Sequence, residues 1–92
     1  MPSPAFRELQ KLFASVRNER EAEMLLKDIL TPRELASVAE RWQLVQLLAR
    51  GVKQREVKKK LKISISKVTR GSRMLKGGSG GFAYFLKKLK KA

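Results

Sequence analysis

The chain has 92 residues, enough for one small domain with a modest core. It contains no cysteine and no histidine, which excludes disulfides and removes the commonest metal ligand and the usual general base. No apolar run approaches the length that spans a bilayer, and the first ten residues lack the pattern of a secretion signal. We therefore expect a cytoplasmic protein without a membrane or metal partner.

The net charge of +14 is concentrated in the second half of the chain. Residues 1–50 carry eight Lys/Arg and seven Asp/Glu, whereas residues 51–92 carry fourteen Lys/Arg and a single acid, Glu56. The first half is typical of a folding or dimerising core, and the second half of a surface that attracts phosphate. A lysine-rich face can also be merely solvated, but this one coincides with the helical pattern described below.

Three helices are predicted in the first half, each from a start signal ahead of apolar residues at helical spacing. The start signals are an N-cap serine with proline, a capping box, and an N-cap threonine with proline and glutamate: Ser3-Pro4, Asn18 with Glu21, and Thr31-Pro32-Arg33-Glu34. Gly51 is expected to end the third helix as a C′ glycine. Trp42 has helical apolar spacing and is expected in the core.

The segment Gln54–Ser72 predicts two short helices joined by a tight turn. Its five apolar positions can close a small core between crossed helices: Val57, Leu61, Ile63, Ile65 and Val68. The remaining residues are mostly basic or small and polar, as a DNA-reading helix-turn-helix requires of its outer face. Ser64 is the expected N-cap of the second helix, whose first turn usually meets base edges.

Residues 77–81, Gly-Gly-Ser-Gly-Gly, are predicted to form a flexible hinge. They lack the Lys-Ser/Thr ending of a phosphate-binding P-loop, and no strand precedes them. Residues 82–92 predict a short basic helix with an apolar side formed by Phe82, Phe85, Leu86 and Leu89. Such a helix can lie on an anionic membrane or dock on a partner subunit, and its shortness favours docking.

The chain is thus predicted to be an all-α, six-helix, single-domain protein. Residues 1–51 would form dimerisation and core helices, 52–76 the helix-turn-helix, 77–81 the hinge and 82–92 the basic C-terminal helix. The predicted function is a homodimeric transcription regulator that binds double-stranded DNA sequence-specifically. The alternative is a basic RNA-binding or nucleoid-associated protein with little sequence preference. An enzyme is not expected, because no nucleophile–base pair is visible.

Several motifs together resemble the tryptophan repressor superfamily over about residues 30–76. They are LTPRE at 30–34, ER at 40–41, LLARG at 47–51, QRE at 54–56 and TRGSxxLK at 69–76, in the family's order and with one residue missing after Gly51. The tail LKGGSGGF also resembles repressor-related bacterial proteins with a Gly-rich stretch. The resemblance implies an intertwined homodimer that binds operator DNA, with L-tryptophan as corepressor.

The resemblance also implies site residues. Arg55 and Lys58 match basic residues at the DNA, while Ile65, Ser66 and Thr69 fall on the recognition helix. With the residues around them, the predicted DNA contacts are Arg55, Lys58, Ser64, Ile65, Ser66, Lys67, Thr69 and Arg70. The predicted corepressor pocket consists of Leu30, Thr31, Arg41, Arg70 and Gly71.

Three positions depart from the family pattern. Lys67 replaces a small threonine and Met74 a serine near the pocket, and Lys62 replaces a glycine in the turn, where a left-handed conformation costs about 1 kcal/mol. An amino-acid ligand needs a guanidinium for its carboxylate, which Arg70 or Arg41 can supply. Alternatively, Arg41 pairs with a neighbouring acid and Arg70 contacts phosphate. The departures predict a DNA-competent state without L-tryptophan or another small-molecule corepressor.

Overall fold

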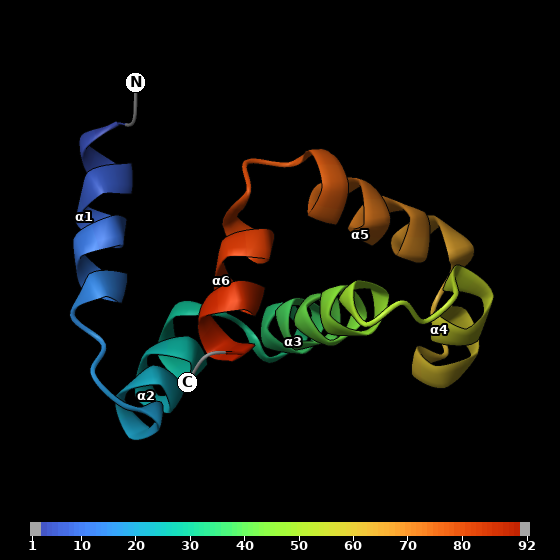
Figure 1. Cartoon of the computed structure of the whole chain (residues 1–92). Helices are drawn as coiled ribbons and strands as arrows, with labels where there is room; N and C mark the ends of the chain where they lie inside the picture. Colours follow the sequence, from blue (N-terminus) through green and yellow to red (C-terminus); the bar gives the residue numbers. More distant parts are fainter. Residues whose placement is uncertain (1–2, 91–92) are drawn as a thin grey trace. The chain divides into compact units, whose positions relative to one another are not determined.

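The structure is a computed structural model that describes residues 3–90. These residues form six α-helices and no strand (Figure 1). The helices are α1 (Pro4–Ala14), α2 (Glu19–Ile29), α3 (Pro32–Ala49), α4 (Gln54–Leu61), α5 (Ile65–Gly77) and α6 (Gly81–Lys90). The predicted all-α, six-helix class is therefore confirmed. None of the described helices is both long enough and apolar enough to cross a membrane.

The chain divides into two compact units, with the boundary between Leu35 and Ala36 near the start of α3. The first unit contains α1, α2 and the beginning of α3. The second contains the rest of α3 and the three helices that follow it. The basic segment of the sequence therefore belongs to the second unit together with most of the longest helix.

Side-chain caps start the helices of the first unit. The N–H of Phe6 donates to Ser3 Oγ at 3.1 Å, and the N–H of Glu21 donates to Asn18 Oδ1 at 2.9 Å. The capping box predicted at Asn18 differs in one bond, because the Glu21 carboxylate accepts from the N–H of Arg17 rather than from that of Asn18. The glutamate thus binds one residue further back than the predicted motif requires.

The start of α3 has the complete reciprocal pattern. The N–H of Glu34 donates to Thr31 Oγ1 at 3.1 Å, and the N–H of Thr31 donates to Glu34 Oε1 at 2.8 Å. The pKa of Glu34 lies below its ordinary value, chiefly because its carboxylate accepts from the N–H of Thr31 and secondly because of a hydrogen bond with the Thr31 hydroxyl. The ionised carboxylate of Glu34 therefore stabilises the start of α3.

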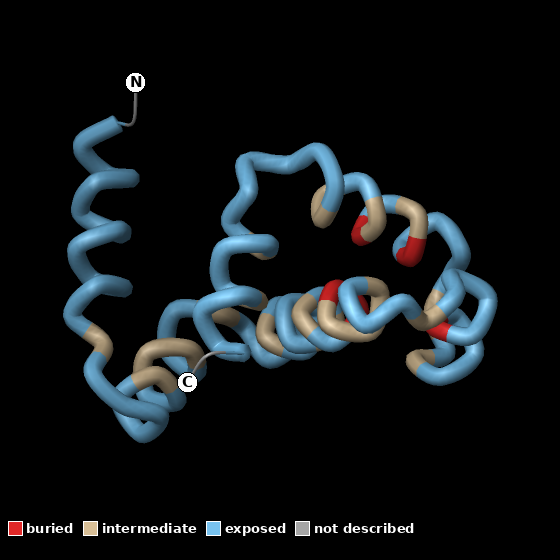
Figure 2. The backbone as a smooth tube through the Cα atoms, viewed as in Figure 1, coloured by how far each residue is buried: buried red, intermediate tan, exposed pale blue. Residues whose placement is uncertain are grey.

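The first unit leaves much of its apolar surface uncovered. Neither α1 nor α2 contains a buried residue (Figure 2). Their large exposed apolar side chains are Phe6, Leu9, Leu12, Phe13, Met24 and Ile29. Leu25 and Leu26 of α2 are only half-buried. Two helices with this surface gain little from burial within their own unit.

Gly51 ends α3 as predicted. Its φ of +88° is left-handed, and its N–H donates to the carbonyl of Leu48 at 3.1 Å while that of Val52 donates to the carbonyl of Leu47 at 3.2 Å. These two bonds are the pair of a Schellman motif. Val52 and Leu47 both contact the hydrophobic core, so the cap also returns the chain towards α4.

The core of the second unit is formed by α3, α4 and α5. Leu44, Val57 and Val68 are buried at its centre (Figure 2). Half-buried apolar residues surround them: Leu47, Leu48, Val52, Leu61 and Ile63. Four of the five apolar positions predicted in the α4–α5 segment thus reach this core. Ile65 does not, because it is the first residue of α5 and its side chain is 48% exposed.

The turn between α4 and α5 consists of Lys62, Ile63 and Ser64. Lys62 adopts the left-handed conformation expected of this position, with φ 54° and ψ 47°. The N–H groups of Lys62 and Ile63 both donate to the carbonyl of Lys58, which closes the end of α4 and directs Ile63 to the core.

Two expectations from the sequence need correction. The helices extend into the predicted 77–81 hinge, because Gly77 ends α5 and Gly81 begins α6, so only residues 78–80 link them. Trp42 is not a buried core residue. It is half-buried, and its ring stacks on that of Phe82 with the centroids 6.0 Å apart.

Candidate nucleic-acid interface

The α4–α5 pair presents most of the predicted contact residues at its surface. Seven of the eight are exposed: Arg55, Lys58, Ser64, Ile65, Ser66, Lys67 and Arg70. Thr69 is half-buried. Close backbone approaches connect α5 mainly to α4 and α6. A ligand as large as a nucleic acid can reach this surface without displacing core side chains.

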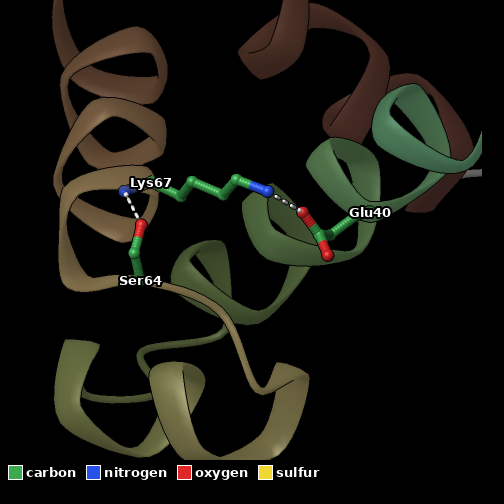
Figure 3. Close-up of polar contacts among 3 residues, drawn as sticks. All are labelled: Glu40, Ser64 and Lys67. Atoms are coloured by element: carbon green, nitrogen blue, oxygen red, sulfur yellow. Dashed lines mark hydrogen bonds and ion pairs between the residues drawn. The ribbon is translucent and has the colours of Figure 1, made fainter. Parts of the chain in front are cut away.

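Ser64 caps the first turn of α5. Its Oγ accepts a hydrogen bond from the N–H of Lys67 at 3.2 Å, and its φ and ψ are extended, as an N-cap requires (Figure 3). The N-terminal end of a helix carries partial positive charge and N–H groups without helical partners. The exposed start of α5 is therefore suited to polar or anionic groups.

Positive charge extends along α4, the turn and α5. The turn and helix residues concerned are Arg55, Lys58, Lys59, Lys60, Lys62, Lys67, Arg70, Arg73 and Lys76. The only acid on either helix is Glu56. Within residues 3–90, Lys67 is the only one of these nine side chains that forms an ion pair. The rest of the cluster keeps its charge available for phosphate oxygens.

Lys67 extends from α5 to α3, where its Nζ lies 3.2 Å from Glu40 Oε1 (Figure 3). The Glu40 side chain is 32% exposed and that of Lys67 is 58% exposed. Lys67 was expected to add positive charge for phosphate, and the contact with Glu40 offsets part of it. Glu40 belongs to the ER motif of the sequence, but its contact with Lys67 was not predicted, although it is the only acid between residues 35 and 55.

A small cavity of about 140 Å³ lies beside this ion pair, between α3 and α5. It is lined by Ser37, Glu40, Arg41, Leu44, Lys67, Arg70, Gly71 and Met74. The structure therefore brings together Arg41, Arg70 and Gly71 of the predicted pocket, with the two departing residues, Lys67 and Met74. Its volume lies below the roughly 300–1,000 Å³ that is typical of small-molecule sites.

The other two predicted pocket residues belong to the first unit. Leu30 is the half-buried C-cap of α2, and Thr31 is the exposed N-cap residue of α3. No metal site accompanies the cavity, since residues 3–90 contain no cluster of three or more acidic, His or Cys side chains that could hold an ion.

A larger and mostly apolar cavity of about 560 Å³ lies between α3, α5 and α6. Its walls include Trp42, Phe82, Phe85 and Leu89, together with the glycine-rich link. Met74 contributes to the walls of both this cavity and the smaller one. A substitution at Met74 would therefore change the boundary between the two spaces.

Residues 3–90 form six helices, and the basic α4–α5 pair, joined by a tight turn, packs against the longer helix α3. This arrangement is that of a small all-helical regulator of the trp repressor type. Residues 5–90 match the Trp repressor protein family, and the chain belongs to this family.

Curated relatives agree with this assignment. A protein named Trp operon repressor homolog from Mannheimia succiniciproducens is 40% identical over 72 residues, which cover 77% of this chain and 71% of the relative. A protein of the same name from Chlamydia trachomatis serovar L2 is 35% identical over 81 residues, covering 83% of this chain and 86% of the relative. No solved structure matches the chain significantly.

Proposed function

We propose that this protein is a cytoplasmic, sequence-specific regulator that binds double-stranded DNA and represses transcription. The observation that carries the proposal is the exposed, serine-capped start of α5 within a cluster of basic residues, of which Lys67 pairs with Glu40. A helix of this kind fits the major groove, where its first turn meets base edges while flanking cations hold phosphates. The names of the relatives support the repressor role.

The contact residues divide by chemistry. Arg55 can pair bidentately with guanine, and the exposed Ile65 can contact a thymine methyl group. Ser64, Ser66 and Thr69 offer hydroxyl groups for bases or phosphates. The cations at Lys58, Lys67 and Arg70 attract the backbone. In this proposal α4 and α5 form the DNA-reading helix-turn-helix, and the protein catalyses no reaction.

The proposed active form is a homodimer. The uncovered apolar side chains of α1 and α2 supply a surface that a second copy would bury. A two-fold dimer presents two copies of α5 to successive major grooves, about 34–36 Å apart. Residues 1–51 would serve dimerisation and 52–76 DNA reading, residues 78–80 would link α5 to α6, and the basic helix α6 would dock on the partner.

In this proposal a corepressor has only a minor effect on DNA binding. Arg41 and Arg70 line a cavity that suits a carboxylate, as L-tryptophan or another amino acid would need. The cavity is small, however, and Met74 and the Glu40–Lys67 pair occupy its borders. We therefore propose that DNA binding does not depend strongly on a ligand.

The second candidate, favoured by the net charge of +14 alone, is a non-specific RNA-binding or nucleoid-associated protein. Competition between duplex DNA, duplex RNA and single strands of equal length separates the two. A regulator prefers duplex DNA, whose major groove admits a helix, whereas that of duplex RNA is deep and narrow. Equal binding to duplex RNA and duplex DNA would support the second candidate and contradict the first.

A further inference from the structure

We propose that the Glu40–Lys67 ion pair positions the DNA-reading helix α5 against α3 in the ligand-free protein. This inference rests on the function proposed above and concerns Glu40, a residue outside the DNA surface. Glu40 would act as a positioning residue through Lys67.

The ion pair and one of the apolar contacts between α3 and α5 involve residues four apart on each helix. On α3, Glu40 lies four residues before Leu44, and on α5, Lys67 lies four residues before Gly71. Residues four apart occupy the same face of a helix, one turn from each other. Leu44 contacts Gly71 closely, and Glu40 contacts Lys67 one turn nearer the start of α5.

A polar contact adds a constraint to the apolar contacts that hold α5 against α3. The apolar contact of Gly71 with Leu44 sets how closely α5 approaches α3. Val68 shares this core with Leu44, and a pivot of α5 about these apolar contacts would shift its first turn relative to the cavity of about 140 Å³ beside them. The ion pair crosses the gap at the other side of the cavity and opposes that pivot. The end of α5 that it holds is the end that Ser64 caps.

The negative charge of Glu40 allows its positioning role to be distinguished from electrostatic repulsion of DNA, because the two effects change operator affinity in opposite directions. A carboxylate near bound DNA repels phosphate, so its removal alone would strengthen binding to any duplex. If Glu40 positions α5, its removal has the opposite effect on a specific site, because the first turn of α5 loses its orientation. Binding to random DNA, which does not depend on that orientation, would not weaken.

The first experiment measures binding of full-length wild type, Glu40→Gln and Glu56→Gln to a selected operator and to random duplex DNA. Glu56→Gln is the matched control, since it removes one carboxylate from the same unit, and Glu56 forms no ion pair within residues 3–90. Exposed pairs each change an equilibrium by a small factor, and a dimer has two of them, so we expect Glu40→Gln to lower operator affinity about three- to tenfold. Glu56→Gln should bind as tightly as wild type or more tightly. Equal or tighter operator binding by Glu40→Gln would overturn the proposal.

The second experiment needs no DNA and measures amide hydrogen exchange at the start of α5. The N–H of Lys67 donates to Ser64 Oγ and that of Val68 donates to the carbonyl of Ser64, so both amides report on this turn. Exchange of both should accelerate in Glu40→Gln. In the background of Lys67→Met, which removes the partner charge, adding Glu40→Gln should change nothing.

Unchanged exchange in Glu40→Gln would overturn the positioning role whatever the DNA result. The two hypotheses fail separately. If the wild type does not distinguish operator from random DNA, the proposed function is wrong, and exchange alone then decides whether Glu40 holds α5. If the wild type does distinguish them, both experiments must give the stated results.

Discussion

Gly71 of α5 and Leu44 of α3 meet where no β-carbon fits between them. A Cβ added to Gly71 would lie 2.6 Å from Leu44 Cδ2 and 2.9 Å from Leu44 Cγ. Both residues are buried, so neither has solvent into which it can move. A glycine at this position is therefore required by packing, since Gly71 lies within α5 and needs no left-handed conformation.

Gly71→Ala is predicted to destabilise the second unit by about 1–3 kcal/mol, the usual effect of an overpacked core. The measurement is denaturant unfolding followed by circular dichroism. Gly77→Ala, in the last turn of the same helix, is the control because nothing lies within 4 Å of its added Cβ. It should be neutral or stabilise by up to about 1 kcal/mol. Equal stability of the two variants would show that α5 does not approach α3 this closely.

Deleting residues 1–17, which include α1, is predicted to lower the mass seen by light scattering or to leave the chain unfolded. A milder variant, Phe6→Ser with Phe13→Ser, should weaken the dimer because both side chains are half-exposed on one face of α1. Lys11→Ser, on the opposite face, should leave the mass unchanged. A stable dimer of the deleted chain would contradict the dimer interface proposed for this helix.

Arg55→Ala is predicted to reduce discrimination between operator and random DNA, by about 1–3 kcal/mol if Arg55 pairs with guanine. Lys87→Ala, on the basic face of α6, should instead lower both affinities alike. Titration of each variant with both duplexes at one salt concentration provides the comparison. Should Arg55→Ala weaken both duplexes equally, Arg55 would be a phosphate anchor.

L-Tryptophan is predicted to change operator affinity by less than about tenfold, which corresponds to a coupling below about 1.4 kcal/mol. Met74 borders the small cavity and leaves little room for an indole ring. Met74→Ser should enlarge that cavity and increase the coupling. Calorimetric titration with L-tryptophan, paired with operator binding, measures both quantities. Micromolar binding of the amino acid to the wild type, with a large gain in DNA affinity, would refute ligand independence.

The helices were predictable because their signals are local. Thr31 with Glu34, Ser64 and Gly51 each satisfy backbone groups within a few residues of themselves, so the sequence alone reveals them. The left-handed conformation of Lys62 was suggested by the family resemblance instead, because a glycine usually occupies that position in the turn.

The contacts between helices were not predictable. Glu40 and Lys67 are 27 residues apart, and the spacing of neither residue reveals the partner of the other. Ile65 was placed in the core on its helical spacing, but the position at the start of α5 turns it to solvent. Trp42 likewise depends on α6, because Phe82 is the ring on which it stacks. Such contacts are set by how the elements cross, which local pattern does not specify.

Selection of bound sites from random duplex DNA tests the central claim most directly. A homodimer that reads DNA with two copies of α5 should enrich a two-fold symmetric motif, with half-sites about 10–10.5 base pairs apart or a multiple of that spacing. A second selection with Ser66→Ala and Thr69→Ala should relax the preference within each half-site without changing the spacing. A motif of this symmetry is the predicted result. Recovery of bound duplexes with no enriched sequence would contradict the claim and identify the protein as a non-specific nucleic-acid-binding protein.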